Sequence, residues 1–255
     1  MTRTPSRLPR GRDAVSRVLA VALLLVVGMA APGAAQPPPR ITMDDPSWRL
    51  ESTRDGIALY CAEVVGTGIV PWKAVMAIPG TIEEVSTVLE DIPRRGDWID
   101  RFGLSVLLER ASDYEQVEYL RVRMPWPVRD RSALIRVRIA VSDDLRRATI
   151  AAASDESHPH DTLPVLVRSL VYASTFQMTQ VGDHVEVAAL VFIDPRGRIP
   201  KWVVNYFTSG VARTTLEGLR RQVARGLYSP QQTEALHARM AAYRSFQQLR
   251  AGPPE

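Results

Sequence analysis

The sequence predicts an α+β fold in which a curved antiparallel β-sheet wraps around one long C-terminal α-helix. Between residues 57 and 193, apolar and polar residues alternate in successive runs separated by glycine and aspartate turns, a pattern typical of antiparallel strands. From Pro200 to Tyr228 the apolar residues instead recur every three or four positions, which indicates a helix of about seven turns. A sheet that curves around such a helix leaves a space between the two, and we expect a hydrophobic tunnel there.

The elements before this helix are predicted from caps, turns and periodicity. Thr81, with Glu84 three residues later, forms a capping box and predicts the start of a short helix. Residues 94–102 are predicted to form a second short helix that carries Trp98 inward. Strands are expected at residues 57–64, 69–78, 103–110, 114–124, 133–139, 147–153, 166–180 and 184–193, after a weak element at 48–53.

The first 35 residues have the pattern of a secretory signal peptide. Arginines dominate residues 1–17, an apolar run follows from Val18 to Ala31, and small residues surround its end. The run is shorter than the roughly 20 residues that a membrane-spanning helix needs. We therefore expect cleavage near Ala35 and a periplasmic or secreted protein, rather than an uncleaved inner-membrane anchor. The rest of the chain divides into a proline-rich linker at 36–47, one domain at 48–228 and a helical C-terminal tail at 229–255.

Charge balance and cysteine content narrow the classes of protein. The chain has 32 basic and 28 acidic residues, a net charge of +4, but residues 1–35 hold five arginines and one aspartate, so 27 of each remain. A balanced domain without a basic run gives no reason to expect nucleic-acid binding. Cys61 is the only cysteine, so the chain has no internal disulfide and its core must hold it together.

The sequence contains no established motif for catalysis or for a cofactor. It lacks the G-x-S-x-G, H-E-x-x-H, Walker and G-x-G-x-x-G patterns. His158 and His160 are close in sequence but have no cysteine partner, so a solvated loop explains them better than a metal site. A Ser/His/Asp arrangement stays open, because its members converge in space rather than in sequence. We expect no metal site.

Two sets of residues are candidates for the wall of the tunnel. The bulky apolar candidates on the last helix are Trp202, Val203, Tyr206 and Phe207. Those that share one face of the strand at 114–124 are Leu120, Val122 and Met124. Glu118 continues that face, and a carboxylate there needs a partner or a polar ligand group, so we predict that Glu118 is a polar contact in the tunnel. The alternative is that these side chains fill a solid core.

Two motifs resemble those of the START domain, the lipid-transfer family named after the steroidogenic acute regulatory protein. Residues 124–131 read MPWPVRDR, similar to the W-P-x-x-D-R-D loop of the family. Residues 194–205 read DPRGRIPKWVVN, similar to the D-P-x-G-x-I-P-x-W-x-x-N start of its last helix. The resemblance covers about residues 45–228. It departs from the family pattern at Ser132, where a second acidic residue is usual, and this puts the anchoring of the loop through Arg131 in doubt.

The resemblance implies a helix-grip fold whose hydrophobic tunnel holds a lipid or another apolar molecule, without a cofactor. It also implies that the Trp126 loop and the turn at 202–207 act as a lid. The prolines beside Trp126 support a mobile loop, because they remove donors that would tie it to a sheet. An exposed tryptophan would suit a membrane interface. The alternative is that Trp126 packs beneath the last helix.

The expected function is non-enzymatic lipid binding and transfer. A sterol, phospholipid, hopanoid or fatty acid would be held in the tunnel and exchanged during transient contact with a membrane surface. Two alternatives stay open. One is a cyclase- or aromatase-like enzyme on the same fold, which would need convergent acid–base residues in the tunnel. The other is a ligand-responsive interaction module in which residues 231–249 bind a protein partner, whose identity the sequence does not indicate.

Overall fold

The computed structural model describes residues 40–155, 166–229 and 231–232 of the chain. Outside these residues lie the predicted signal peptide at 1–35, residues 36–39 of the predicted linker, His158 and His160, and nearly all of the predicted tail. Within the described part, no helix is long and apolar enough to cross a membrane.

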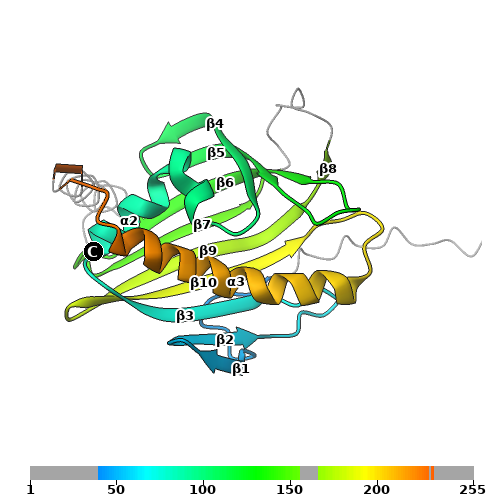
Figure 1. Ribbon diagram of the computed structural model, residues 1–255, viewed down its shortest axis with the longest axis horizontal. Coiled ribbons are helices and arrows are strands. Elements are labelled where there is room, and N and C mark those ends of the chain that lie inside the picture. Colours follow the sequence, from blue (N-terminus) through cyan, green and yellow to red (C-terminus); the bar gives the residue numbers. More distant parts are fainter. Residues whose placement is uncertain (1–39, 156–165, 230, 233–255) are drawn as a thin grey trace, which may run out of the picture. The chain divides into compact units, whose positions relative to one another are not determined.

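A curved ten-stranded sheet forms the body of the described domain. One long helix, α3 (Lys201–Ala224), lies across its inner face (Figure 1). The strand order is β1-β2-β3-β10-β9-β7-β6-β5-β4 with antiparallel pairing, and the short β8 pairs parallel with β6. The strands are β1 (Arg49–Arg54), β2 (Ile57–Cys61), β3 (Trp72–Pro79), β4 (Phe102–Ser112), β5 (Glu115–Val122), β6 (Arg131–Val141), β7 (Arg147–Ser154), β8 (Val167–Arg168), β9 (Leu170–Val181) and β10 (His184–Asp194).

Alternation of side chains along the strands builds the core. In β3, Trp72, Ala74, Met76 and Ile78 are buried, while the residues between them are more accessible, as expected for a strand with one face toward the core. β3 pairs with β10, and Met76 lies opposite the buried Val187. This pairing joins the N-terminal hairpin to the last strand before α3.

Two short helices connect β3 to β4. The predicted capping box is present: the Thr81 side chain accepts a hydrogen bond from the Glu84 amide, and the Glu84 carboxylate accepts one from the Thr81 amide. It starts α2 (Ile82–Glu90). The second helix, η1 (Ile92–Asp97), is a 3₁₀-helix that ends before the limit predicted for it. Trp98 follows it and is buried, which confirms that this residue points inward.

The second half of α3 anchors the helix to the core. Its buried residues are Val204, Ala212, Thr215, Leu216, Gly218, Leu219 and Gln222. Only Val204 precedes Gly210, so the first turns contribute little to the main hydrophobic cluster. The predicted fold, a curved antiparallel sheet around a long C-terminal helix, is confirmed. The strand expected at 166–180 is divided into β8 and β9.

Candidate ligand-binding site

Two adjoining cavities lie between the sheet and α3. The larger has a volume of about 190 Å³ and is bounded by η1, by strands from β4 to β10 and by the middle of α3. The smaller, of about 120 Å³, is bounded by the β5–β6 loop and the first turns of α3. Val122, Val191, Ile193 and Val211 line both. A continuous apolar wall therefore runs from one cavity to the other.

Few polar groups interrupt these apolar walls. The charged side chains are Arg95 and Asp100 in the larger cavity and Arg101 and Arg131 in the smaller. An apolar pocket with a few polar groups is typical of a small-molecule site, although such sites usually measure about 300 Å³ or more. Accommodating a whole lipid therefore requires the surrounding elements to move. Among the described residues, no group of three or more His, Cys, Asp or Glu side chains is placed to hold a metal ion.

Glu118 is fully buried and is bound by protein groups. Its carboxylate forms an ion pair with Arg95 and accepts hydrogen bonds from Ser105 at 2.7 Å and from Gln116 at 2.6 Å. Burial alone would raise the pKa of Glu118, but the charge of Arg95 and these hydrogen bonds outweigh burial and lower the pKa. Arg95 lines the larger cavity and Glu118 does not. The prediction that Glu118 contacts the ligand in the tunnel is therefore wrong: Arg95 lies at the wall, and Glu118 lies behind it as the counter-ion.

Asp130 organises the loop between β5 and β6, which carries Trp126. Its carboxylate accepts hydrogen bonds from the Arg121 guanidinium at 2.6 and 2.9 Å and from the Met124 amide at 3.1 Å. The Met124 amide, followed by Arg121, lowers the pKa of Asp130. The loop therefore keeps a local acidic anchor.

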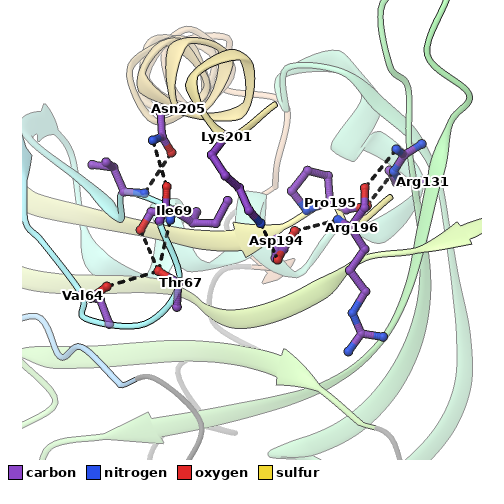
Figure 2. Close-up of polar contacts among 11 residues, drawn as sticks. Val64, Thr67, Ile69, Arg131, Asp194, Pro195, Arg196, Lys201 and Asn205 are labelled. Atoms are coloured by element: carbon purple, nitrogen blue, oxygen red, sulfur yellow. Dashed lines mark hydrogen bonds and ion pairs between the residues drawn. The ribbon is translucent and has the colours of Figure 1, made fainter. Parts of the chain in front are cut away.

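Arg131 ties this loop to the turn before α3. Its guanidinium donates hydrogen bonds to the carbonyls of Arg129 and Pro195, both at 2.6 Å, and of Arg196 at 3.2 Å. Figure 2 shows the guanidinium directed at the backbone of the turn. The bridge is made through carbonyls and needs no acidic side chain at Ser132, the position where the sequence departs from the family motif.

The motif at 194–205 holds the start of α3 in place (Figure 2). The Lys201 ammonium lies 3.0 Å from the Asp194 carboxylate. The Asn205 side chain accepts a hydrogen bond from the Val70 amide at 2.9 Å and donates one to the Gly68 carbonyl at 3.2 Å. These polar contacts link the first turns of the helix to β10 and to the β2–β3 loop, beside the packing of the buried Val204 in a cluster with Ile69 and Phe192.

The structure divides the predicted tunnel residues into two groups. Those that line a cavity are Leu120 in the larger, Val122 in both, and Met124, Val203 and Phe207 in the smaller. Trp202 and Tyr206 line neither; each is 73% exposed, so the prediction that they enter the tunnel is wrong. Residues four apart share a helix face. Val203 and Phe207 occupy the inner face, and Trp202 and Tyr206 occupy the outer one.

Trp126 is 93% exposed. This excludes the alternative that it packs beneath α3. Its neighbours Pro125 and Val128 line the smaller cavity, so the exposed indole lies at the rim of that cavity. The lid function of this loop stays a prediction.

Four polar residues of the larger cavity were not predicted from the sequence: Arg95, Asp100, Ser174 and Thr215. Arg95 precedes the inward-facing Trp98 by three positions, a spacing that places two residues on one side of a short helix. That spacing was a usable signal. Thr215 lies within the apolar stripe of α3. A threonine in such a stripe gives no indication that it lines a cavity.

Comparisons with known proteins identify relatives across the described domain. The START domain family model matches residues 39–231. The chain is 27% identical over 174 residues to an uncharacterized protein of Pseudomonas aeruginosa, covering 68% of this chain and 85% of that protein. It is 26% identical over 163 residues to the phosphatidylcholine transfer protein of Mus musculus, covering 62% and 75% of the two chains. A crystal structure of a STAR-related lipid transfer protein fragment from Xanthomonas axonopodis matches with a TM-score of 0.61 and 25% identity, covering 70% and 99%.

Proposed function

This chain belongs to the START domain family, and we propose on that premise that it binds a lipid between its sheet and α3 and transfers it between membranes. The pair of adjoining apolar cavities under α3 carries the proposal. Burial of apolar ligand surface contributes about 25 cal/mol per Å² before ordering costs. A lipid therefore gains by leaving water for this space. The similarity to phosphatidylcholine transfer proteins supports a lipid ligand.

Opening of the smaller cavity is the step that admits the ligand. The β5–β6 loop and the first turns of α3 bound this cavity, and among those turns only Val204 is buried. Besides Val204, which packs in a cluster with Ile69 and Phe192, polar contacts through Lys201 and Asn205 hold them. Such contacts can exchange with water as the turns move, at less cost than the separation of a packed core. In this proposal the movement joins the two cavities into one tunnel.

Arg95 is the polar contact that we propose for the ligand. A guanidinium carries five N–H donors, and Arg95 uses three hydrogen bonds on Glu118 and the Leu89 carbonyl. Its remaining donors are available to an oxygen of a ligand in the larger cavity. Sterols, phospholipids, hopanoids and fatty acids all combine an apolar body with such an oxygen.

The walls favour a carrier over an enzyme. General acid–base catalysis needs titratable side chains placed around the reacting atoms. Among the described residues, the two cavities are lined by one carboxylate, that of Asp100, and by no histidine. We place the exchange in the periplasm or outside the cell, on the basis of the signal peptide predicted at 1–35.

Native extraction tests the proposal. The protein, purified from the organism that encodes it, is extracted with organic solvent, and the extract is analysed by mass spectrometry. We expect one lipid class in amounts comparable to the protein. A chain that carries no lipid, and takes none from vesicles, would contradict lipid binding.

A matched pair of β7 variants separates lipid in the cavity from lipid on the surface. Ala152 lines the larger cavity, whereas its neighbour Ala153 is exposed. Because successive residues of a strand face opposite sides, Ala152→Phe fills the cavity and Ala153→Phe does not. The first variant should lower the extracted lipid roughly tenfold, because the added ring occupies the ligand's space. The second should leave the yield unchanged.

A further inference from the structure

Two hydrogen-bond donors in the wall of the larger cavity have no partner among the described residues. They are the indole N–H of Trp98 and the hydroxyl of Thr215. Both side chains are buried, with Trp98 4% and Thr215 6% exposed. Buried polar groups are hydrogen-bonded in the large majority of cases. Two unpaired donors in the wall of one cavity therefore point to a shared role in binding.

The helix backbone satisfies the other threonines of α3 but not Thr215. The Thr208 hydroxyl donates to the Val204 carbonyl and the Thr214 hydroxyl to the Gly210 carbonyl, both at 3.0 Å. This is the usual local solution for a threonine within a helix. Within the described chain Thr215 makes no such bond, so its donor remains available on the buried side of α3.

Close packing joins the two segments that carry these donors. Gly218 lies three residues after Thr215, on the same face of the helix. A Cβ atom at Gly218 would lie 2.1 Å from the Trp98 carbonyl oxygen, so α3 approaches the backbone at Trp98 directly. The Trp98 ring is also fixed edge-on against Phe176, with 6.1 Å between ring centroids. The indole and the hydroxyl thus belong to two elements in firm contact.

We propose that Trp98 and Thr215 form a subsite that binds an uncharged acceptor oxygen of the ligand, such as a hydroxyl, ketone or ester carbonyl. The inference rests on the proposed function, because it concerns one part of the same cavity. The carboxylate of Asp100 lines that cavity, and the charge of Arg95 is matched by Glu118. An anion at this subsite would therefore lack an available counter-ion, while an uncharged oxygen needs none.

Two probes of similar shape test the subsite in the full chain. 2-Acetylnaphthalene carries a ketone oxygen, and 2-ethylnaphthalene does not. Thr215→Val keeps the shape of the side chain and removes its donor. We expect this substitution to weaken binding of the ketone roughly fivefold, the worth of one hydrogen bond, and to leave the Kd of the hydrocarbon unchanged.

Thr214→Val is the matched control. The Thr214 side chain is exposed and its hydroxyl is bonded within the helix, so its loss should change the Kd of neither probe. Without ligand, Thr215→Val should unfold at the same temperature as the unmodified chain or higher, because it removes an unpaired buried donor. That result would show that weaker ketone binding does not come from unfolding.

Nuclear magnetic resonance of the indole N–H groups reports on the second donor. The Trp98 signal, identified by its loss in Trp98→Phe, should shift with the ketone and not with the hydrocarbon. An unmoved signal, or an equal effect of Thr215→Val on both probes, would overturn the subsite and leave the apolar cavity standing. Failure of the unmodified chain to bind either probe would overturn the subsite and count against the proposed lipid cavity as well.

Discussion

At the scale of single residues, Arg95 and Glu118 form an ion pair that offsets the cost of removing their charges from water. A charged group removed from water is costly unless it is paired and hydrogen-bonded. Glu118 meets this condition through Arg95, Ser105 and Gln116, and Arg95 meets it through Glu118. The pair thereby supports a cation at the wall of an apolar cavity.

Glu118→Gln should destabilise the protein by about 3 kcal/mol at pH 7, because it leaves the guanidinium of Arg95 buried without a counter-ion. Urea unfolding monitored by circular dichroism measures the loss. Glu115→Gln is the control, since Glu115 pairs with Arg136 at the surface, where both side chains are a quarter or more exposed. Its effect should be much smaller. Equal losses in the two variants would contradict the assigned role of Glu118.

The pH dependence has a definite sign. The folded state lowers the pKa of Glu118, so the stabilisation is fully present above the unfolded value of about 4.3 and is lost as pH falls through the folded pKa. The free energy of unfolding of the unmodified chain should therefore fall toward that of Glu118→Gln below about pH 4. A gap between the two that stays constant on acidification would show that the carboxylate does not titrate in this way.

At the scale of elements, two glycines of α3 meet opposite surroundings. A side chain at Gly218 would collide with the Trp98 carbonyl at 2.1 Å, whereas one at Gly210 would meet nothing within 4 Å. Glycine is unfavourable in a helix because it leaves the unfolded chain more conformational freedom. The absence of a side chain at Gly218 permits the close contact between α3 and the backbone of Trp98, whereas Gly210 makes no such contact.

Alanine at these two positions should have effects of opposite sign. Gly218→Ala should lower the free energy of unfolding by about 1–3 kcal/mol, because backbone atoms cannot move aside for the methyl group. Gly210→Ala should raise it by about 0.5–1 kcal/mol through helix propensity. Thermal and urea unfolding of both variants check this. Stabilisation by both would show that α3 does not press on Trp98 as the structure describes.

At the scale of the whole molecule, exposed aromatic side chains lie on the two segments that bound the smaller cavity, the β5–β6 loop and the first turns of α3. Trp126 on one side is 93% exposed, and Trp202 and Tyr206 on the other are each 73% exposed. Arg131 connects the two sides through its hydrogen bonds to both loops. The segments 123–131 and 194–202 carry six basic residues and two acidic ones. Aromatic and basic groups together suit an anionic membrane surface.

If the protein docks on a membrane through this rim, the double variant Trp126→Ala/Trp202→Ala should bind membranes less strongly than the unmodified chain. Partition onto vesicles of phosphatidylcholine and phosphatidylglycerol, measured by sedimentation of the full chain, should fall by roughly tenfold or more, because two large apolar side chains no longer enter the interface. Added salt should weaken binding of the unmodified chain, since screening reduces the attraction of its basic residues.

Leu50→Ala is the control for this experiment. Leu50 lies on β1, away from the cavity opening, and is 59% exposed, so its removal should not affect partition. All chains carry the same N-terminal segment, and any membrane affinity of that segment cancels in the comparison. Equal partition of the unmodified chain and the aromatic variant would exclude the rim as the docking surface.

Local rules of sequence predicted those features that depend on a few neighbouring residues. The capping box at Thr81 was correct because its hydrogen bonds close within one helical turn. The inward position of Trp98 was also correct. The expected roles of Trp202 and Tyr206 in the tunnel were wrong because they depend on the rotation of α3 about its own axis, and one residue corresponds to about 100° of that rotation.

The sequence by itself determined the class of fold, the order of its elements and the family, because strand and helix periods and the motifs at 124–131 and 194–205 are written in adjacent residues. The tertiary structure alone decided that Val203 and Phe207, and not Trp202 and Tyr206, face the cavity, that Arg95 stands at its wall with Glu118 behind it, and that Thr215 and Trp98 line the same cavity. The reason is physical. Each of these placements depends on contacts between segments far apart in the chain, and no local pattern specifies which side chains will meet when a sheet closes on a helix.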